Sequence, residues 1–129
     1  MAREVVPNFD RAFSALLEDL VDRGLLQNTI VTAMGEFGRT PKINPAGGRD
    51  HHPGCWTVLG AGGPIQGGRV VGASDEIGYA PKERPVSTAE IAATVYHGLG
   101  ISLDTELPGP QGRPLRVVDH GIEPIMELF

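Results

Sequence analysis

Two short apolar segments, residues 29–34 and 55–60, constrain the fold of this chain more than any other feature. The first reads Thr-Ile-Val-Thr-Ala-Met and the second reads Cys-Trp-Thr-Val-Leu-Gly, and neither carries a charge. Short uncharged segments that are rich in β-branched residues and bordered by glycine are typical of buried β-strands. We therefore expect two strands that lie next to each other in one sheet.

A helix is expected before the first strand. Apolar residues recur at helical spacing from Phe9 to Val21 and form one continuous stripe. Asn8 is the expected N-cap, and Gly24 can adopt the left-handed conformation that ends many helices. The segment 9–23 should therefore be helical, with the apolar stripe facing the sheet.

A second helix is expected late in the chain. Ser87 and Glu90 have the spacing of a capping box, and Gly100 follows the last apolar position. The order helix, strand, loop, strand, glycine-rich segment, helix favours an α/β fold with a mainly parallel sheet flanked by helices. From about residue 102, prolines and glycines predominate, so we expect a loop-rich C-terminal tail. Nothing indicates a boundary inside residues 1–129, which should form a single domain.

Composition excludes several classes of function. The formal net charge of −5 argues against electrostatic binding of nucleic acid. The single cysteine, Cys55, excludes an internal disulfide and a cysteine-based zinc site. No segment approaches the roughly 20 apolar residues of a membrane span, and the first residues lack the apolar core of a signal peptide.

Candidate metal ligands lie in the loops next to the two predicted strands. Glu36 follows the first strand, and Asp50 and His51 precede the second. Carboxylate and imidazole groups together suit zinc or manganese, and carboxylate oxygens also suit calcium. We expect Glu36 and His51 to converge on one divalent ion. The alternatives are a salt bridge from Glu36 to a nearby arginine, and a turn in which Asp50 bonds its own backbone.

Two arginines of the same loops are candidate anion-binding residues. Arg39 and Arg49 could each hold a phosphate or sulfate group through two parallel hydrogen bonds. Their alternative role is to balance the charges of Glu36 and Asp50. Both roles can hold at once.

Five segments together resemble a known family. They are Gly-Glu-Phe-Gly-Arg-Thr-Pro at 35–41, Gly-Arg-Asp-His at 48–51, Arg-Pro-Val at 84–86, His-Gly-Leu-Gly-Ile at 97–101 and Glu-Pro-Ile-Met-Glu-Leu-Phe at 123–129. They resemble the C-terminal third of the domain of unknown function 1501 proteins. That family is similar to the alkaline phosphatase and sulfatase superfamily. The resemblance implies an incomplete alkaline-phosphatase-like sandwich, and it also suggests an exported protein.

The resemblance also implies a chemistry. Residues 35–38 occupy the place of the superfamily's Asp-His-Gly metal motif, and His51 occupies the place of a later histidine ligand. Phe37 cannot replace a histidine, so one metal position is weakened or lost. The superfamily's nucleophile lies in an N-terminal region that this chain lacks.

The resulting expectation is the C-terminal half-site of a metal-dependent hydrolase for phosphate or sulfate esters, inactive alone. The half-site would bind zinc, manganese or calcium through Glu36, Asp50 and His51, with Arg39 and Arg49 on the substrate. The alternative is a non-catalytic binding or structural module of the same fold. Because two helices cannot cover both faces of the sheet, we expect self-association or pairing with an N-terminal portion.

Overall fold

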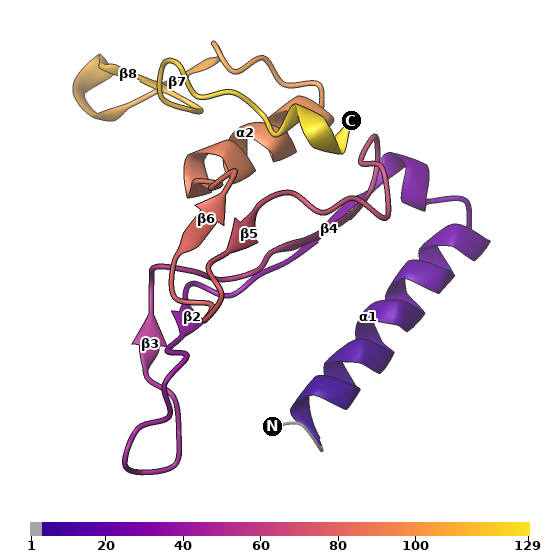
Figure 1. Ribbon diagram of the computed structural model, residues 1–129. Coiled ribbons are helices and arrows are strands. Elements are labelled where there is room, and N and C mark those ends of the chain that lie inside the picture. Colours follow the sequence, from indigo (N-terminus) through magenta and orange to yellow (C-terminus); the bar gives the residue numbers. More distant parts are fainter. Residues whose placement is uncertain (1–3) are drawn as a thin grey trace.

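The computed structural model describes residues 4–129, and its elements are small (Figure 1). The helices and strands, with three 3-10 turns, are α1 (Val5–Asp22), η1 (Leu26–Asn28), β1 (Ile30–Ala33), β2 (Gly38–Arg39), β3 (His51–His52), β4 (Leu59–Gly62), β5 (Ala73–Ser74), β6 (Pro81–Glu83), α2 (Thr88–Gly98), β7 (Glu106–Pro108), η2 (Pro110–Gly112), β8 (Pro114–Arg116) and η3 (Met126–Leu128). The fold class is mixed α/β, as predicted. Neither helix within the described residues is long and apolar enough to cross a membrane.

The strands form four separate antiparallel pairs, β1–β4, β2–β3, β5–β6 and β7–β8. The two predicted core strands are neighbours, as expected, but they pair antiparallel, with Ile30 opposite Gly62 and Ala33 opposite Leu59. A mainly parallel sheet is therefore not what residues 4–129 form. Parallel pairing requires a crossover connection of a dozen or more residues, usually a helix. The segment between β1 and β4 contains instead the β2–β3 hairpin, which returns the chain in the opposite direction.

The second predicted strand lies further along the chain than its apolar run suggests. Residues 55–58 are unpaired, and β4 begins at Leu59 within a glycine-rich stretch. The close approach of the β4 backbone to the residue before β1 explains why the strand begins later than predicted. A Cβ atom on Gly62 would lie 2.2 Å from the carbonyl oxygen of Thr29, so only glycine fits at this register position.

Helix α1 begins earlier than predicted. It starts at Val5 with Glu4 as the N-cap, so the expected cap Asn8 lies inside the helix. Pro7 is tolerated because the first turn of a helix has no intrahelical acceptor for the missing N–H group. The predicted stop is confirmed, since Gly24 has φ +66° and follows the C-cap Arg23.

Helix α2 follows the prediction closely. The capping box of Ser87 and Glu90 is complete in both directions, and Gly100 has φ +71° after the C-cap Leu99. Both helices end in the same Schellman motif. In α1, Leu25 N–H bonds the Leu20 carbonyl, and in α2, Ile101 N–H bonds that of Tyr96.

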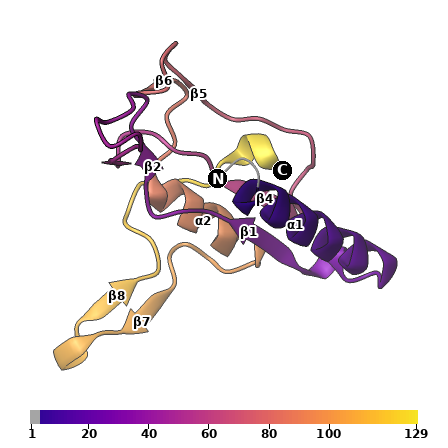
Figure 2. The same cartoon turned by 90° about the horizontal axis from the view of Figure 1, so that it is seen from below.

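The hydrophobic core is small and lies against α2. Among residues 4–129 the buried hydrophobic side chains are Ala93, Val118 and Ile125. Two of these come from the expected loop-rich tail, which also forms the β7–β8 hairpin. Figures 1 and 2 show α1 beside the β1–β4 pair, and Figure 1 shows α2 with the C-terminal segment on the other side. The tail is therefore part of the core rather than an appendage.

The molecule exposes far more surface than a compact domain of its mass. Its accessible surface is 9478 Å² for 13.7 kDa. A folded monomer of this size exposes about 6,600 Å². The excess of about 2,900 Å² reflects an open arrangement of elements. It also agrees with helix α1, in which no side chain is buried.

Candidate functional site

The two sequence blocks that carry the candidate ligands form one hairpin. Strand β2 pairs with β3, which places Gly38 opposite His52 and Arg39 opposite His51. Glu36 lies just before β2, and Arg49 and Asp50 lie just before β3. The structure therefore brings blocks 35–41 and 48–52 together, and residues 40–50 form the loop between them (Figure 1).

A close backbone contact fixes the start of this hairpin. A Cβ atom built on Gly38 would lie 1.9 Å from the carbonyl oxygen of Cys55. That distance leaves no room for any side chain, so the second glycine of the Gly-Glu-Phe-Gly motif has a structural role. The glycine lets the segment after β3 pass directly against β2.

The loop of residues 40–50 is held by its own hydrogen bonds. Asn44 Oδ1 accepts bonds from the backbone N–H groups of Ala46 and Gly48, at 3.1 and 2.9 Å. Asn44 Nδ2 donates to Asp50 Oδ1 at 2.8 Å. The Asp50 N–H donates to Thr40 Oγ1 at 3.0 Å. One carboxylate oxygen of Asp50 is therefore engaged in closing the loop through Asn44, and this contact differs from the expected turn in which Asp50 bonds its own backbone.

Arg49 also binds the loop itself. One of its guanidinium nitrogens donates to the carbonyl oxygen of Thr40 at 2.7 Å and to that of Pro41. Arg39 donates to the carbonyl oxygen of Arg49 at 3.5 Å. The four ion pairs within residues 4–129 include neither arginine. Within the described residues, Arg39 and Arg49 thus bond backbone carbonyl oxygens and form no ion pair with Glu36 or Asp50.

Three side chains stack along one face of the hairpin. The rings of Phe37 and His51 have centroids 3.9 Å apart, and the Arg39 guanidinium carbon lies 5.7 Å from the centroid of the Phe37 ring. Phe37, in the place where the resemblance puts a histidine, thus covers a face of the His51 ring. Ligation by histidine uses a nitrogen lone pair in the plane of the ring, so this stacking leaves His51 able to bind a metal.

The other histidine of the hairpin is buried. His52 is 8 % exposed, and its Nε2 lies 2.6 Å from the carbonyl oxygen of Tyr79. Because a carbonyl oxygen only accepts, Nε2 carries the proton. His52 is not among the predicted site residues, because nothing in the sequence places residue 79 near it. Gly54 leaves room for this ring, since a Cβ atom there would lie 2.9 Å from His52 Nε2.

The candidate ligands do not make a complete metal site within the chain. No group of three or more His, Cys, Asp or Glu side chains that could share one metal ion occurs in the described part of the chain. Glu36 and His51 have suitable donor chemistry, but a structural or catalytic zinc ion needs at least three protein ligands. A divalent ion would therefore need further donors beyond this hairpin.

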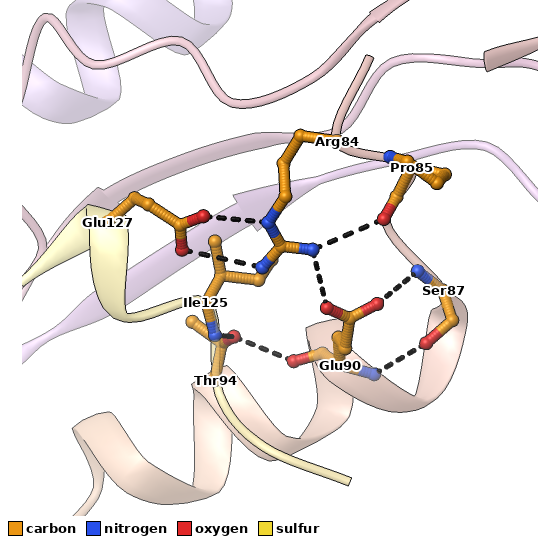
Figure 3. A network of polar contacts seen from close by, with 7 residues as sticks. All are labelled: Arg84, Pro85, Ser87, Glu90, Thr94, Ile125 and Glu127. Carbon is orange, nitrogen blue, oxygen red and sulfur yellow. Dashed lines mark hydrogen bonds and ion pairs between the residues drawn. The ribbon is translucent and has the colours of Figure 1, made fainter. Parts of the chain in front are cut away.

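A polar network around Arg84 was missed by the sequence reasoning about sites. Arg84 Nε lies 2.7 Å from Glu127 Oε1, and its Nη1 lies 2.7 Å from Glu90 Oε1 (Figure 3). The hydrogen bond from the Ser87 backbone and then the bonds from Arg84 hold the pKa of Glu90 below its usual value. Arg84 likewise lowers the pKa of Glu127. The sequence feature that could have indicated this network is the arginine at position 84, three residues before the capping box that begins at Ser87.

This network fastens the C-terminal segment to α2. The Thr94 hydroxyl donates to the Glu90 carbonyl oxygen at 2.6 Å and accepts the Ile125 N–H at 2.9 Å (Figure 3). Shifted pKa values can mark an active site, but ion-pair networks that hold a fold together shift them equally well. The contacts here join elements of the fold.

Comparison with known proteins adds one firm result. A family described as Protein of unknown function (DUF1501) matches residues 1–129. The chain belongs to this family. Comparisons with curated proteins and with solved structures give no match. In this DUF1501 protein, the candidate metal ligands and the candidate anion-binding arginines all lie in or beside the β2–β3 hairpin.

Proposed function

We propose that the β2–β3 hairpin is the C-terminal half of a site for an anionic ester, in a metal-dependent hydrolase-like protein. Glu36 and His51 would contribute two donors to a divalent ion, and Asp50 would hold the loop beside them. Zinc, manganese and calcium are the candidate ions. An alkaline-phosphatase-like sandwich would then be completed by elements beyond residues 1–129.

One observation carries this proposal. The loop closes through Asn44, Asp50 and Arg49, while Glu36 takes part in none of the ion pairs found within residues 4–129. A carboxylate that the loop does not use for its own stability is available to a ligand. Arg39, three residues further along the chain, is exposed and can offer a guanidinium edge to a phosphate or sulfate group.

The division of roles follows from these contacts. The ion would act as a Lewis acid on the ester oxygen. Arg39 would orient the anionic group, and Arg49, whose guanidinium binds two carbonyl oxygens, would keep the loop in shape. Thr40 is the one hydroxyl-bearing residue of the hairpin, and its hydroxyl donates to the carbonyl oxygen of Lys42 at 2.9 Å rather than to a base that could activate it. We therefore expect this chain alone to bind ligand without turning it over.

The decisive experiment measures zinc and manganese binding to the purified chain by calorimetry. Glu36→Gln and His51→Asn should each weaken binding by about tenfold or more, the scale seen when a metal site loses a supporting group. Glu76→Gln, at an exposed carboxylate outside the hairpin, is the matched control and should leave binding unchanged. If the wild type and the three variants bind the ions equally, the proposal is wrong.

Turnover provides a second, independent test. Aryl phosphate and aryl sulfate should show no hydrolysis above the buffer rate with any of the three ions. Turnover that Glu36→Ala abolishes would show that the chain is an enzyme by itself.

A second candidate function is a non-catalytic binding or structural module. The absence of a three-ligand group among residues 4–129, together with Phe37 in the place where the resemblance puts a histidine ligand, favours it. This candidate predicts no metal binding, whereas phosphate or sulfate could still perturb Arg39 in a titration followed by NMR.

A further inference from the structure

Helix α1 carries an apolar seam that the described part of the chain covers only in part. The seam consists of Val5, Phe9, Ala12 and Leu16, all of them exposed. Val5 is 59 %, Phe9 47 % and Leu16 46 % exposed. The spacing of four, three and four residues keeps these side chains in one line along the helix, as in the seam of a coiled coil.

The neighbouring face of α1 already has a different use. Phe13, Leu17 and Leu20 are half-buried and face the rest of the molecule. The seam therefore lies beside this packed face rather than on it, and rotating the helix inward would expose the residues that now pack. A separate partner is needed to cover the seam.

We propose that a second copy of this chain covers the seam, with the two α1 helices packed antiparallel about a two-fold axis. In this arrangement Phe9 of each copy lies opposite Ala12 of the other, and Val5 lies opposite Leu16. The large ring thus meets the smallest side chain of the seam at both equivalent positions. A two-fold interface requires such self-complementarity, because the same patch must fit itself.

The surface area agrees with an interface of this kind. A stable protein–protein contact removes about 800 Å² from each partner, and permanent dimers remove more. The chain exposes 9478 Å², about 2,900 Å² above the value for a compact monomer of its mass. The exposed seam is one apolar part of this excess, which belongs to the whole molecule and is larger than an interface of either class.

A groove beside the seam extends the apolar surface. Its lining includes Phe9, Met34 and Leu59, so one wall belongs to the seam and the others to the ends of β1 and β4. Met34 and Leu59 are exposed, at 52 % and 42 %. A partner helix lying on the seam would also cover the mouth of this groove.

The interface also has a defined limit. Beyond Leu16 the same line of the helix reaches Asp19 and Arg23, which pair with each other at 2.8 Å. The seam from Val5 to Leu16 is about 16 Å long at 1.5 Å per residue. The contact therefore spans three turns of helix and ends at a polar pair.

The test measures molar mass by light scattering on the full chain. At micromolar concentration we expect a dimer with twice the 13.7 kDa of the chain. Leu16→Glu should raise the dissociation constant by about 100-fold, because it buries an unpaired charge. Val70→Glu, at an apolar residue that is 91 % exposed and outside the seam, should leave the dimer intact.

Crosslinking tests the antiparallel arrangement. In a Cys55→Ser background, chains with Phe9→Cys mixed with chains with Ala12→Cys should form a disulfide-linked pair, since the two positions face each other. Each variant alone should crosslink far less. Efficient crosslinking of the Ala12→Cys chain with itself would overturn the antiparallel arrangement.

Other results would overturn the dimer itself. A wild-type monomer at millimolar concentration would do so, because the seam would then serve a different partner or none. A Leu16→Glu chain that remains dimeric, with helical content unchanged by circular dichroism, would place the interface elsewhere.

Discussion

Helices α1 and α2 have similar capping at their C-terminal ends but different surroundings. Helix α2 contains two buried residues, Ala93 and Thr94, and carries the C-terminal segment on its surface. Helix α1 is longer and has the more continuous apolar stripe, yet none of its side chains is buried. An apolar stripe therefore predicts a helix well but does not identify what the helix packs against.

The polar contacts of the two helices differ in the same way. In α2, Glu90 caps its own helix and also binds Arg84, which reaches across to Glu127. In α1, Asp19 and Arg23 pair only along the helix, with both side chains more than half exposed. One set of contacts joins distant parts of the chain, and the other joins neighbours one turn apart.

The largest expected change in the free energy of unfolding comes from Thr94 in α2. Thr94→Val removes the acceptor of the buried Ile125 N–H group, whose loss should cost about 1–3 kcal/mol of unfolding free energy. Urea unfolding at a fixed protein concentration would measure it. Thr94→Ser keeps the hydroxyl and should recover most of the loss. If valine and serine destabilise the protein equally, the hydrogen bond is not what matters at this position.

Loss of the Arg84 network should lower the free energy of unfolding by a smaller amount, and this loss should depend on pH. The pKa values of Glu90 and Glu127 are lowered in the folded protein, so their contribution to stability is present above the unfolded value of about 4.3. The contribution is lost as the pH falls through the lower, folded values. Hydrogen bonds to both glutamates raise the pKa of Arg84, which stays charged throughout.

The variant Arg84→Gln therefore provides the test. It should be less stable than the wild type near pH 7, and the two unfolding curves should converge as the pH falls below about 4. Arg69→Gln is a matched control at an exposed arginine outside this network. A gap between wild type and Arg84→Gln that stays constant down to pH 3 would contradict the role given to the two glutamates.

The smallest effect is expected in α1. Asp19→Ala removes an exposed pair at i, i+4 and should change the unfolding free energy by less than about 0.5 kcal/mol. Thermal unfolding of the two proteins at low and high salt would measure this. A loss as large as that of Thr94→Val would mean that α1 is packed more tightly than its exposure indicates.

Local structure could be predicted from the sequence where a few adjacent residues determine it. The capping box at Ser87, the stop at Gly24 and the strand at residues 30–33 each depend on side chains within one turn or one short run. The start of α1 was misplaced by four residues because Pro7 is compatible with the first turn as well as with the segment before it.

Contacts between distant residues were beyond this kind of prediction. The direction of β4 relative to β1 depends on the hairpin between them, and the burial of His52 depends on Tyr79. For the candidate site, the sequence identified the two blocks that meet in the hairpin. It could not indicate that Arg49 and Asp50 would be engaged by the loop itself, since a charged side chain can bind backbone carbonyls as readily as a ligand.

The hydrogen bonding inside the loop of residues 40–50 has a consequence for the thermodynamics of binding. A flexible loop loses conformational entropy when it closes on a ligand, and this loss weakens the affinity. Here Asn44 and Arg49 have already fixed the backbone in the free protein. An ion or anion that meets Glu36 or Arg39 should therefore bind with little change in the order of the loop, and calorimetry should record a correspondingly small entropic penalty.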